Sequence, residues 1–515
     1  MPRSALNILL VVAVLGPVLG GLAATLPRLR SGRVAVVGST VAVAAATIVA
    51  ATSGVGTPAS WSVGSRLLVE VDRLGGLLMV FVVAVTLLVQ AFARRSLGGD
   101  TSRHRFFAAS GGAAAATVLV VVAADLWTLV VAWVLVSVAT VVLLRHDGRP
   151  AARAAARRAA AAFAVGDLAL LAAALVSSAT VGPVTLRPGA LGDVITADET
   201  LAGPVGVVTV LAVAGVLAAL ARSAQPPAQS WLPMSVAAPT PSSAVLHAGV
   251  VNGSGLLLIR FAPLLAVSPV ATATAVVGGC AGVLVGSAVM RTRADVKGAL
   301  AWSTVAQMGF MAIQCVTGLL GPAVAHLMAH GMYKANLFLG SGSTVPHTHP
   351  QHRPAGTPGP GRVALTIAVT ASTVGLAWLV VRPAALSGAV GIVFLGFIAA
   401  TVAQAAAAWL RRRQDRSLLD LAALVALGAV ATAALALAEG LEVWLEPSLP
   451  VVQPALAVVG AVALALTALT GWIVAVLSRR AGPPHPFVER AYLWALHLGD
   501  PARVAPVLAR QEVRP

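Results

Sequence analysis

Two histidines and a lysine recur at helical spacing inside one apolar run. His326, His330 and Lys334 occupy positions i, i+4 and i+8 of the run 322–339, so a helix would carry them as one stripe on a single face. Imidazole exchanges protons near neutral pH, and a buried lysine, unlike an arginine, can lose its proton. The stripe predicts an intramembrane proton relay. The alternative is that the histidines bond to neighbouring helices and the lysine reaches toward the membrane surface.

Composition places the chain in a membrane. Hydrophobic residues make up 58% of the 515 residues and charged residues only 10%, which is typical of a polytopic membrane protein. The net charge of +17 comes from arginines scattered through short loops, so we expect no nucleic-acid partner. The sequence has no Walker loop, dinucleotide-binding glycine motif or CxxC pair. We therefore expect no cofactor, no metal and no covalent catalysis by this chain.

Runs of about 20 apolar residues predict an all-α membrane protein with about fifteen transmembrane helices. The first run follows a basic start but is too long for a signal peptide, so we interpret it as the first helix. The helices are expected near 5–25, 34–52, 75–93, 106–123, 125–145, 158–177, 203–222, 240–262, 267–289, 299–318, 321–341, 363–381, 386–409, 417–438 and 453–478.

Arginines gather in alternate loops. The loops after odd-numbered helices are basic, whereas the others are short or acidic, with Arg66, Arg73, Arg187 and Arg382 as exceptions. Positively charged loops stay in the cytoplasm. The pattern predicts a multi-pass protein of a bacterial cell membrane, with its N-terminus outside and its C-terminus in the cytoplasm.

Two polar, proline-rich stretches interrupt this regularity. One is 225–233 and the other is 341–360, which contains His347, His349 and His352. Proline-rich backbone beside apolar spans indicates a discontinuous helix, which transporters use to line a cavity. We interpret the three histidines as part of a solvated loop, with metal binding as the less favoured alternative.

Three blocks, in order, resemble the signatures of the antiporter-like, proton-translocating membrane subunits of NADH:quinone oxidoreductase (chain 5 or subunit L) and of the multisubunit sodium/proton antiporters. The first block is Arg222-Ser-Ala-Gln-Pro-Pro-Ala-Gln-Ser-Trp-Leu-Pro, followed by Ala238-Pro-Thr-Pro-Ser-Ser-Ala-Val-Leu-His247. The second runs from Asp295-Val-Lys-Gly to Gln307-Met-Gly, and the third from His326 to Ser343. Gly166-Asp167 is a weaker match. The resemblance covers about 100 to 345. It implies two inverted five-helix repeats with discontinuous helices, near 106–262 and 267–409.

Within this family the chain is most similar to the membrane subunits of DAB inorganic-carbon accumulation complexes. The similarity rests on the segments that begin at His247, Ala301, His330 and Tyr492. We also expect the chain to end without the long lateral helix of the respiratory subunit. The resemblance implies a large zinc-containing, carbonic-anhydrase-like cytoplasmic partner, and an ion flow of H⁺ or Na⁺ that drives conversion of CO2 to bicarbonate.

The functional residues of the family carry over unevenly. The family lysine of the seventh helix falls on Arg222, which keeps its charge at physiological pH and is a poor proton carrier. The family glutamate of the fifth helix falls on Val134, so the usual glutamate–lysine pair is expected to be absent. No lysine stands in the twelfth or thirteenth helix, where Arg382 is the nearest basic residue.

The predicted ion pathway comprises the stripe and five further residues: His247, Arg222, Asp167, Asp125 and Gln307. Four of these five residues have a structural alternative. Asp125 would cap the fifth helix, Asp167 would pair with Arg157 or Arg158, and His247 would be a hydrogen-bonded core histidine. Ser303, Thr304 and Gln307 would only bridge helices.

The predicted organisation has four parts. They are N-terminal transmembrane helices at 1–100, an antiporter-like core at 101–410, C-terminal transmembrane helices at 411–480 and a cytoplasmic amphipathic tail at 481–515. We expect the chain to be the ion-conducting subunit of an inorganic-carbon pump, in contact with lipid. The alternatives are a subunit L-like component of a respiratory or hydrogenase complex, and a non-conducting membrane anchor for a soluble enzyme.

Overall fold

The computed structural model describes residues 2–341 apart from 54–57, 65, 146–147, 188 and 201–205. It also describes 418–450, 486–499 and isolated positions between 364 and 406 and at 462. The predicted helices near 363–381, 386–409 and 453–478 fall almost wholly outside the described residues. The histidine loop beyond Ser341, Arg382 and most of the predicted tail lie outside them as well.

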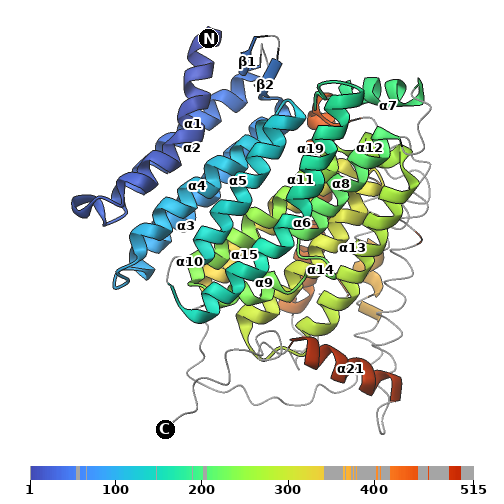
Figure 1. Cartoon of the computed structure of the whole chain (residues 1–515). Helices are drawn as coiled ribbons and strands as arrows, with labels where there is room; N and C mark the ends of the chain where they lie inside the picture. The colour runs from blue at the N-terminus through green and yellow to red at the C-terminus, as the bar shows by residue number, and fades with distance from the viewer. Residues whose placement is uncertain are drawn as a thin grey trace.

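The described chain is a bundle of long helices that run up and down (Figure 1). Ten of its helical stretches are long and apolar enough to cross a membrane, so the prediction of an all-α membrane protein is confirmed. The long helices are α1 (Arg3–Ala23), α2 (Arg33–Ser53), α3 (Arg73–Ser96), α4 (Arg103–Val122), α5 (Leu126–Arg145), α6 (Pro150–Thr180), α8 (Val207–Arg222), α13 (Pro269–Met290), α14 (Val296–Val316), α15 (Leu320–Gly340) and α19 (Leu418–Leu445).

Two small elements were not predicted. Strands β1 (Ser60–Val63) and β2 (Arg66–Glu70) form an antiparallel hairpin between α2 and α3, and α7 (Ala190–Thr200) is a short helix between α6 and α8. Both lie at the same end of the bundle in Figure 1. A search for long apolar runs cannot find such short, partly polar elements.

Helix α8 stops part-way through the bundle. Its last residue is Arg222, and the chain then turns through Ala224, whose φ of 56° lies in the left-handed region. The backbone N–H of Gln225 donates back to the carbonyl of Leu220 at 2.8 Å. Short turns α9 (Trp231–Met234) and η2 (Ser235–Ala237) follow. The polar stretch after Arg222 is therefore non-helical backbone inside the protein, as predicted.

The predicted helix 240–262 is also interrupted, which the apolar pattern did not indicate. It consists of α10 (Thr240–Ala248), the turn η3 (Val250–Asn252) and α11 (Gly253–Arg260), followed by α12 (Ala262–Val267). The break begins at Gly249. Its polar backbone is buried within the protein, which is the setting in which irregular backbone is tolerated at membrane depth.

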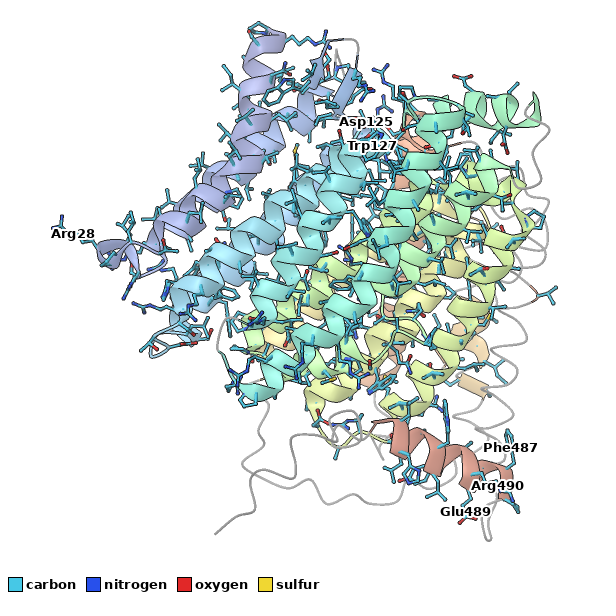
Figure 2. All side chains as sticks on the ribbon, viewed as in Figure 1. Arg28, Asp125, Trp127, Phe487, Glu489 and Arg490 are labelled. Carbon is cyan, nitrogen blue, oxygen red and sulfur yellow. The ribbon has the colours of Figure 1, made fainter. Side chains whose placement is uncertain are left out.

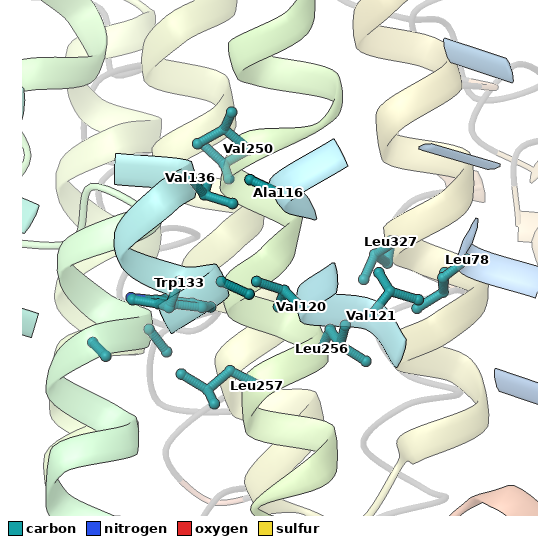
Figure 3. Close-up of a cluster of buried hydrophobic side chains, with 14 of the residues drawn as sticks. Leu78, Ala116, Val120, Val121, Trp133, Val136, Val250, Leu256, Leu257 and Leu327 are labelled. Atoms are coloured by element: carbon teal, nitrogen blue, oxygen red, sulfur yellow. The ribbon is translucent and has the colours of Figure 1, made fainter. Parts of the chain in front are cut away.

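An apolar cluster joins the N-terminal helices to the interrupted ones (Figure 3). Leu78 of α3, Val121 of α4 and Trp133 of α5 meet Leu256 of α11 and Leu327 of α15 in one continuous buried core. Leu327 lies between the two stripe histidines of α15, so this packing helps to fix the stripe within the bundle.

Charge divides between the two ends of the bundle. Arg28 lies toward the same end as α21 (Pro486–Gly499), where Arg293 donates a hydrogen bond to the carbonyl of Gly499. Asp125 lies at the opposite end (Figure 2), which also carries the ion pair between Arg260 and Asp72, at 2.7 Å. We call these the basic end and the acidic end.

Candidate functional site

The predicted stripe lies on α15 and faces α14. Lys334 is fully buried, and its Nζ donates to the carbonyl of Leu300 at 3.0 Å and to Ser303 Oγ at 2.9 Å. Among the described residues no carboxylate forms an ion pair with it. The amine is held only by neutral acceptors, an arrangement that suits both its protonated and its unprotonated form.

Both stripe histidines bond to glutamines of α14. His330 Nδ1 lies 2.6 Å from Gln307 Oε1, and His326 Nδ1 lies 2.7 Å from Gln314 Oε1. An amide oxygen only accepts, so each imidazole donates through Nδ1. In the neutral ring Nε2 is then the basic atom that can take up a further proton. The two rings meet edge to face, with their centroids 6.0 Å apart.

His247 joins the stripe from α10. Its Nδ1 lies 3.1 Å from Thr304 Oγ1, and that hydroxyl donates to the carbonyl of Leu300 at 3.0 Å. The hydroxyl oxygen therefore accepts from His247, and the carbonyl of Leu300 is shared with Lys334. The ring of His247 stacks on Phe338 with centroids 4.3 Å apart. These contacts connect His247 to Lys334 through three hydrogen bonds, which pass through the Thr304 hydroxyl and the shared carbonyl of Leu300.

A second polar cluster surrounds Arg222 at the broken end of α8. Its Nη2 donates to Ser137 Oγ at 2.7 Å and to the carbonyl of Trp133 at 3.1 Å. Asp167 Oδ1 lies 3.5 Å away and accepts from Ser137 Oγ at 3.0 Å. Arg222 also lies over the rings of Trp133 and Phe163, 4.2 Å and 4.8 Å from their centroids. The guanidinium is thus sandwiched and paired, which fixes its charge in place.

Gln225 links the two clusters. Its Nε2 donates to the carbonyls of Ser223 and of Val305, the latter at 3.1 Å. Val305 follows Thr304, the partner of His247. The Gln225 side chain fits between α13 and α14 because Gly282 and Gly309 have no Cβ. An added Cβ at either position would clash with the Gln225 side chain.

Asp167 and Arg222 form an ion pair, with Oδ1 and Nη2 3.5 Å apart. Among the described residues, Asp167 forms its ion pair with Arg222 and not with the alternative partners Arg157 and Arg158. The carboxylate that pairs with Arg222 comes from α6, a contact that the sequence patterns did not predict. Val134, at the family's glutamate position, is 37% exposed, whereas its neighbour Trp133 faces Arg222.

Asp125 lies apart from both clusters. Its carboxylate accepts from the backbone N–H of Thr128 at 3.0 Å and from its hydroxyl at 2.6 Å, at the start of α5. This is the capping arrangement.

The residues missed by sequence reasoning are Ser137, Gln225 and Gln314. Gln314 lies seven positions after Gln307 on the same face of α14, so its helical spacing was an available signal.

Metal ligands are not grouped in the part of the chain that the structure covers. There, no three or more histidine, cysteine, aspartate or glutamate side chains come together in a metal-binding group. His347, His349 and His352 lie outside that part. The polar groups of the stripe are an amine, imidazoles, amides and hydroxyls, and the second cluster adds the guanidinium of Arg222 and the carboxylate of Asp167.

A family model for the transmembrane domain of NADH:quinone oxidoreductase and Mrp antiporters matches residues 123–359. The match covers the central part of the chain. The matched segment runs from the start of α5 past the end of α15 and contains both polar clusters. The chain is therefore a multi-pass membrane protein whose central part is similar to antiporter-like membrane subunits.

Two curated relatives show the similarity in sequence. The chain is 33% identical over 352 residues to the probable inorganic carbon transporter subunit DabB1 of Halothiobacillus neapolitanus, which covers 66% of this chain and 62% of that protein. It is 30% identical over 316 residues to NADH-quinone oxidoreductase subunit L of Mycobacterium tuberculosis, covering 61% and 48%. The chain thus spans less than two thirds of either relative.

A solved structure shares the fold. The Mrp complex from Dietzia sp. DQ12-45-1b matches with a TM-score of 0.54 and 22% sequence identity, over 99% of this chain and 57% of that one. At this identity the match concerns the fold alone. Both curated relatives are named as subunits.

Proposed function

We propose that this chain is the ion-conducting membrane subunit of an inorganic-carbon pump. Ions that move down their gradient through it would drive hydration of CO2 to bicarbonate by a large, zinc-containing, carbonic-anhydrase-like cytoplasmic partner. The observation that carries the conducting role is the buried stripe, in which Lys334 and two histidines face a row of neutral acceptors. Similarity to proteins named as inorganic carbon transporter subunits supports the carbon substrate.

The proposed path for the ion follows α15. His326 and Lys334 are separated by about 12 Å along the helix axis, which is a large part of the distance across the hydrocarbon core. His330 lies between them, and His247 approaches from α10. The titratable groups of the path are imidazoles and an amine, whose nitrogens exchange protons, whereas hard cations prefer oxygen ligands. We therefore propose H⁺ as the ion.

Arg222 has a different part in this proposal. Its charge is held by Asp167, Ser137 and two aromatic rings, and arginine does not release its proton at physiological pH. It sets the electric field near the path, and Gln225 fixes its distance from α14. Asp125 is left out of the path because its carboxylate is occupied in capping α5.

The orientation of the chain follows from its charge. The basic end would face the cytoplasm of a bacterial cell and the acidic end would face outward. The N-terminus then lies outside. Helix α21 lies at the basic end, where it would meet both the inner lipid surface and a cytoplasmic partner.

A second candidate function is a proton-translocating, subunit L-like component of a respiratory complex. The 30% identity to such a subunit over 316 residues favours it. A third, a non-conducting anchor for a soluble enzyme, predicts that the stripe is dispensable. The neighbouring genes separate the first two, because a zinc-site protein accompanies a carbon pump and redox subunits accompany a respiratory complex.

The test is growth at ambient CO2 of a carbonic-anhydrase-deficient host that expresses this chain together with the protein encoded beside it. We expect rescue that disappears when an uncoupler dissipates the proton gradient. Rescue by the neighbouring protein alone, or rescue that survives the uncoupler, would contradict the proposal. Loss of quinone-linked proton pumping on deletion in the native host would favour the respiratory alternative.

A further inference from the structure

Helix α21 lies across the basic end of the bundle (Figure 1). One of its faces packs inward: Ala495 and Gly499 are buried, and Leu498 packs against the core. An added Cβ on Gly499 would come within 2.9 Å of Cγ1 of Val289, near the end of α13. The guanidinium of Arg293 donates to the carbonyl of Gly499. These contacts fix α21 against the bundle.

A second face of α21 is apolar and exposed. Four residues recur at i, i+3, i+4 and i+7 and therefore share one side of the helix: Glu489, Tyr492, Leu493 and Leu496. The three uncharged side chains are 55%, 43% and 40% exposed. Figure 2 shows Glu489 on the side of α21 that points away from the bundle, so the four residues form an outer face of the helix.

Lipid does not account for the outer face. A helix that lies on a membrane turns its apolar residues toward the lipid, whereas the outer face of α21 points away from the spanning helices. Its one charged residue is Glu489, which the anionic headgroups of an inner leaflet would repel. A compact group of exposed apolar and aromatic side chains is typical of a protein–protein interface.

We propose that the outer face of α21 is the docking surface for the cytoplasmic protein partner of this chain. The inference deepens the proposed function and rests on the cytoplasmic partner that it includes. The matching surface of the partner is an apolar groove that receives Leu493 and Leu496, with a basic side chain that pairs with Glu489.

Contacts at the basic end connect the outer face to the ion path. The guanidinium of Arg293, which holds the end of α21, also donates to Asp295, with Nε 2.7 Å from Oδ1. Asp295 caps α14, because its other oxygen accepts from the backbone N–H of Gly298 at 2.6 Å. Leu300, whose carbonyl accepts from Lys334, follows on α14. A partner docked on α21 is therefore linked through one arginine and one helix cap to the acceptors of the stripe.

The test is photo-crosslinking in cells that express this chain together with the protein encoded beside it. The photoreactive residue p-benzoylphenylalanine is incorporated in place of Leu493, and mass spectrometry identifies the crosslinked product. We expect crosslinks to the neighbouring protein. The same probe in place of Val277, an exposed residue in the span α13, should give none above background. Products at position 493 that contain only lipid or only a second copy of the chain, or no product with the neighbouring protein, overturn the inference.

Co-purification of the two proteins in mild detergent is the second measurement. Leu493→Glu combined with Leu496→Glu should lower the amount of co-purified neighbouring protein by about tenfold or more, because charges replace the central apolar contacts. The matched control is Leu26→Glu, which changes an exposed leucine beside Arg28 at the same end of the bundle and should co-purify like the wild type. Normal co-purification of the double variant at a wild-type membrane level overturns the inference.

The two proposals fail in distinguishable ways. A wild-type complex that crosslinks through position 493 but gives no growth at ambient CO2 would refute the proposed function and support the docking surface. Rescue of growth without crosslinks from position 493 would refute the docking surface alone. If the double variant does not accumulate, the crosslinking result decides.

Discussion

The Arg222 cluster and the α15 stripe are both buried and polar, yet they are built in opposite ways. Arg222 has a carboxylate, a hydroxyl, a carbonyl and two aromatic rings around its guanidinium. Lys334 has only a carbonyl and a hydroxyl. The first arrangement holds a charge permanently, and the second lets a charge come and go. The Arg222 cluster therefore supplies a fixed positive charge, whereas the α15 stripe can exchange a proton.

The largest effect is expected at Lys334. Lys334→Met and Lys334→Arg should both lower proton-coupled carbon uptake by at least about tenfold, because neither side chain exchanges a proton. The measurement is uptake of labelled bicarbonate by cells with matched membrane levels of the protein. Lys297→Met, which changes the only other lysine, is the control and should keep most of the uptake. Wild-type uptake by Lys334→Arg would show that a permanent charge suffices there.

At Arg222, unlike at Lys334, we expect a substitution that keeps the positive charge to be tolerated better than one that removes it. Arg222→Ala should lower the free energy of unfolding by about 3–5 kcal/mol, because the partly buried carboxylate of Asp167 would lose its charged partner. Arg222→Lys retains the charge and should keep more of the stability and of the uptake than Arg222→Ala does. Thermal unfolding in detergent, followed beside uptake, measures both. Equal behaviour of the two variants would contradict a field effect at this site.

The glutamines of α14 should give an intermediate effect. Gln307→Leu removes the acceptor that fixes the His330 tautomer and leaves Nδ1 buried without a partner, at a cost of about 1–3 kcal/mol. We expect a reduced uptake that Gln307→Glu partly restores, because glutamate keeps an acceptor oxygen. Uptake assays with both variants check this. If Gln307→Leu lost stability and kept full uptake, the glutamine would serve only to bridge the helices.

The smallest effect on uptake is expected at a polar network outside both clusters. Gln90 of α3 accepts from Ser39 Oγ at 2.8 Å and donates to Ser110 Oγ at 3.1 Å. All three side chains are buried. Gln90→Leu should lower the melting temperature and leave the uptake per folded molecule unchanged. A loss of uptake without a loss of stability would mean that the path extends into the N-terminal helices.

Sequence patterns were sufficient for some of these features and insufficient for others. The spans appear as long apolar runs because the hydrocarbon core imposes their length, and the stripe appears because helical spacing fixes which residues share a face. The partner of Asp167 did not appear, because a contact between α6 and α8 depends on how far α8 continues before it breaks. The break at Gly249 was also missed, since an interrupted helix buried in protein keeps the apolar composition of a continuous one.

The central claim is that protons cross through the α15 stripe, and the most direct measurement is the growth of a carbonic-anhydrase-deficient host at ambient CO2. The host carries Lys334→Ala or His330→Ala with the neighbouring protein, and the membrane level of each variant is matched to the wild type. The account predicts no rescue by Lys334→Ala, impaired rescue by His330→Ala and normal growth of all strains at high CO2. Rescue equal to the wild type by both variants would contradict it.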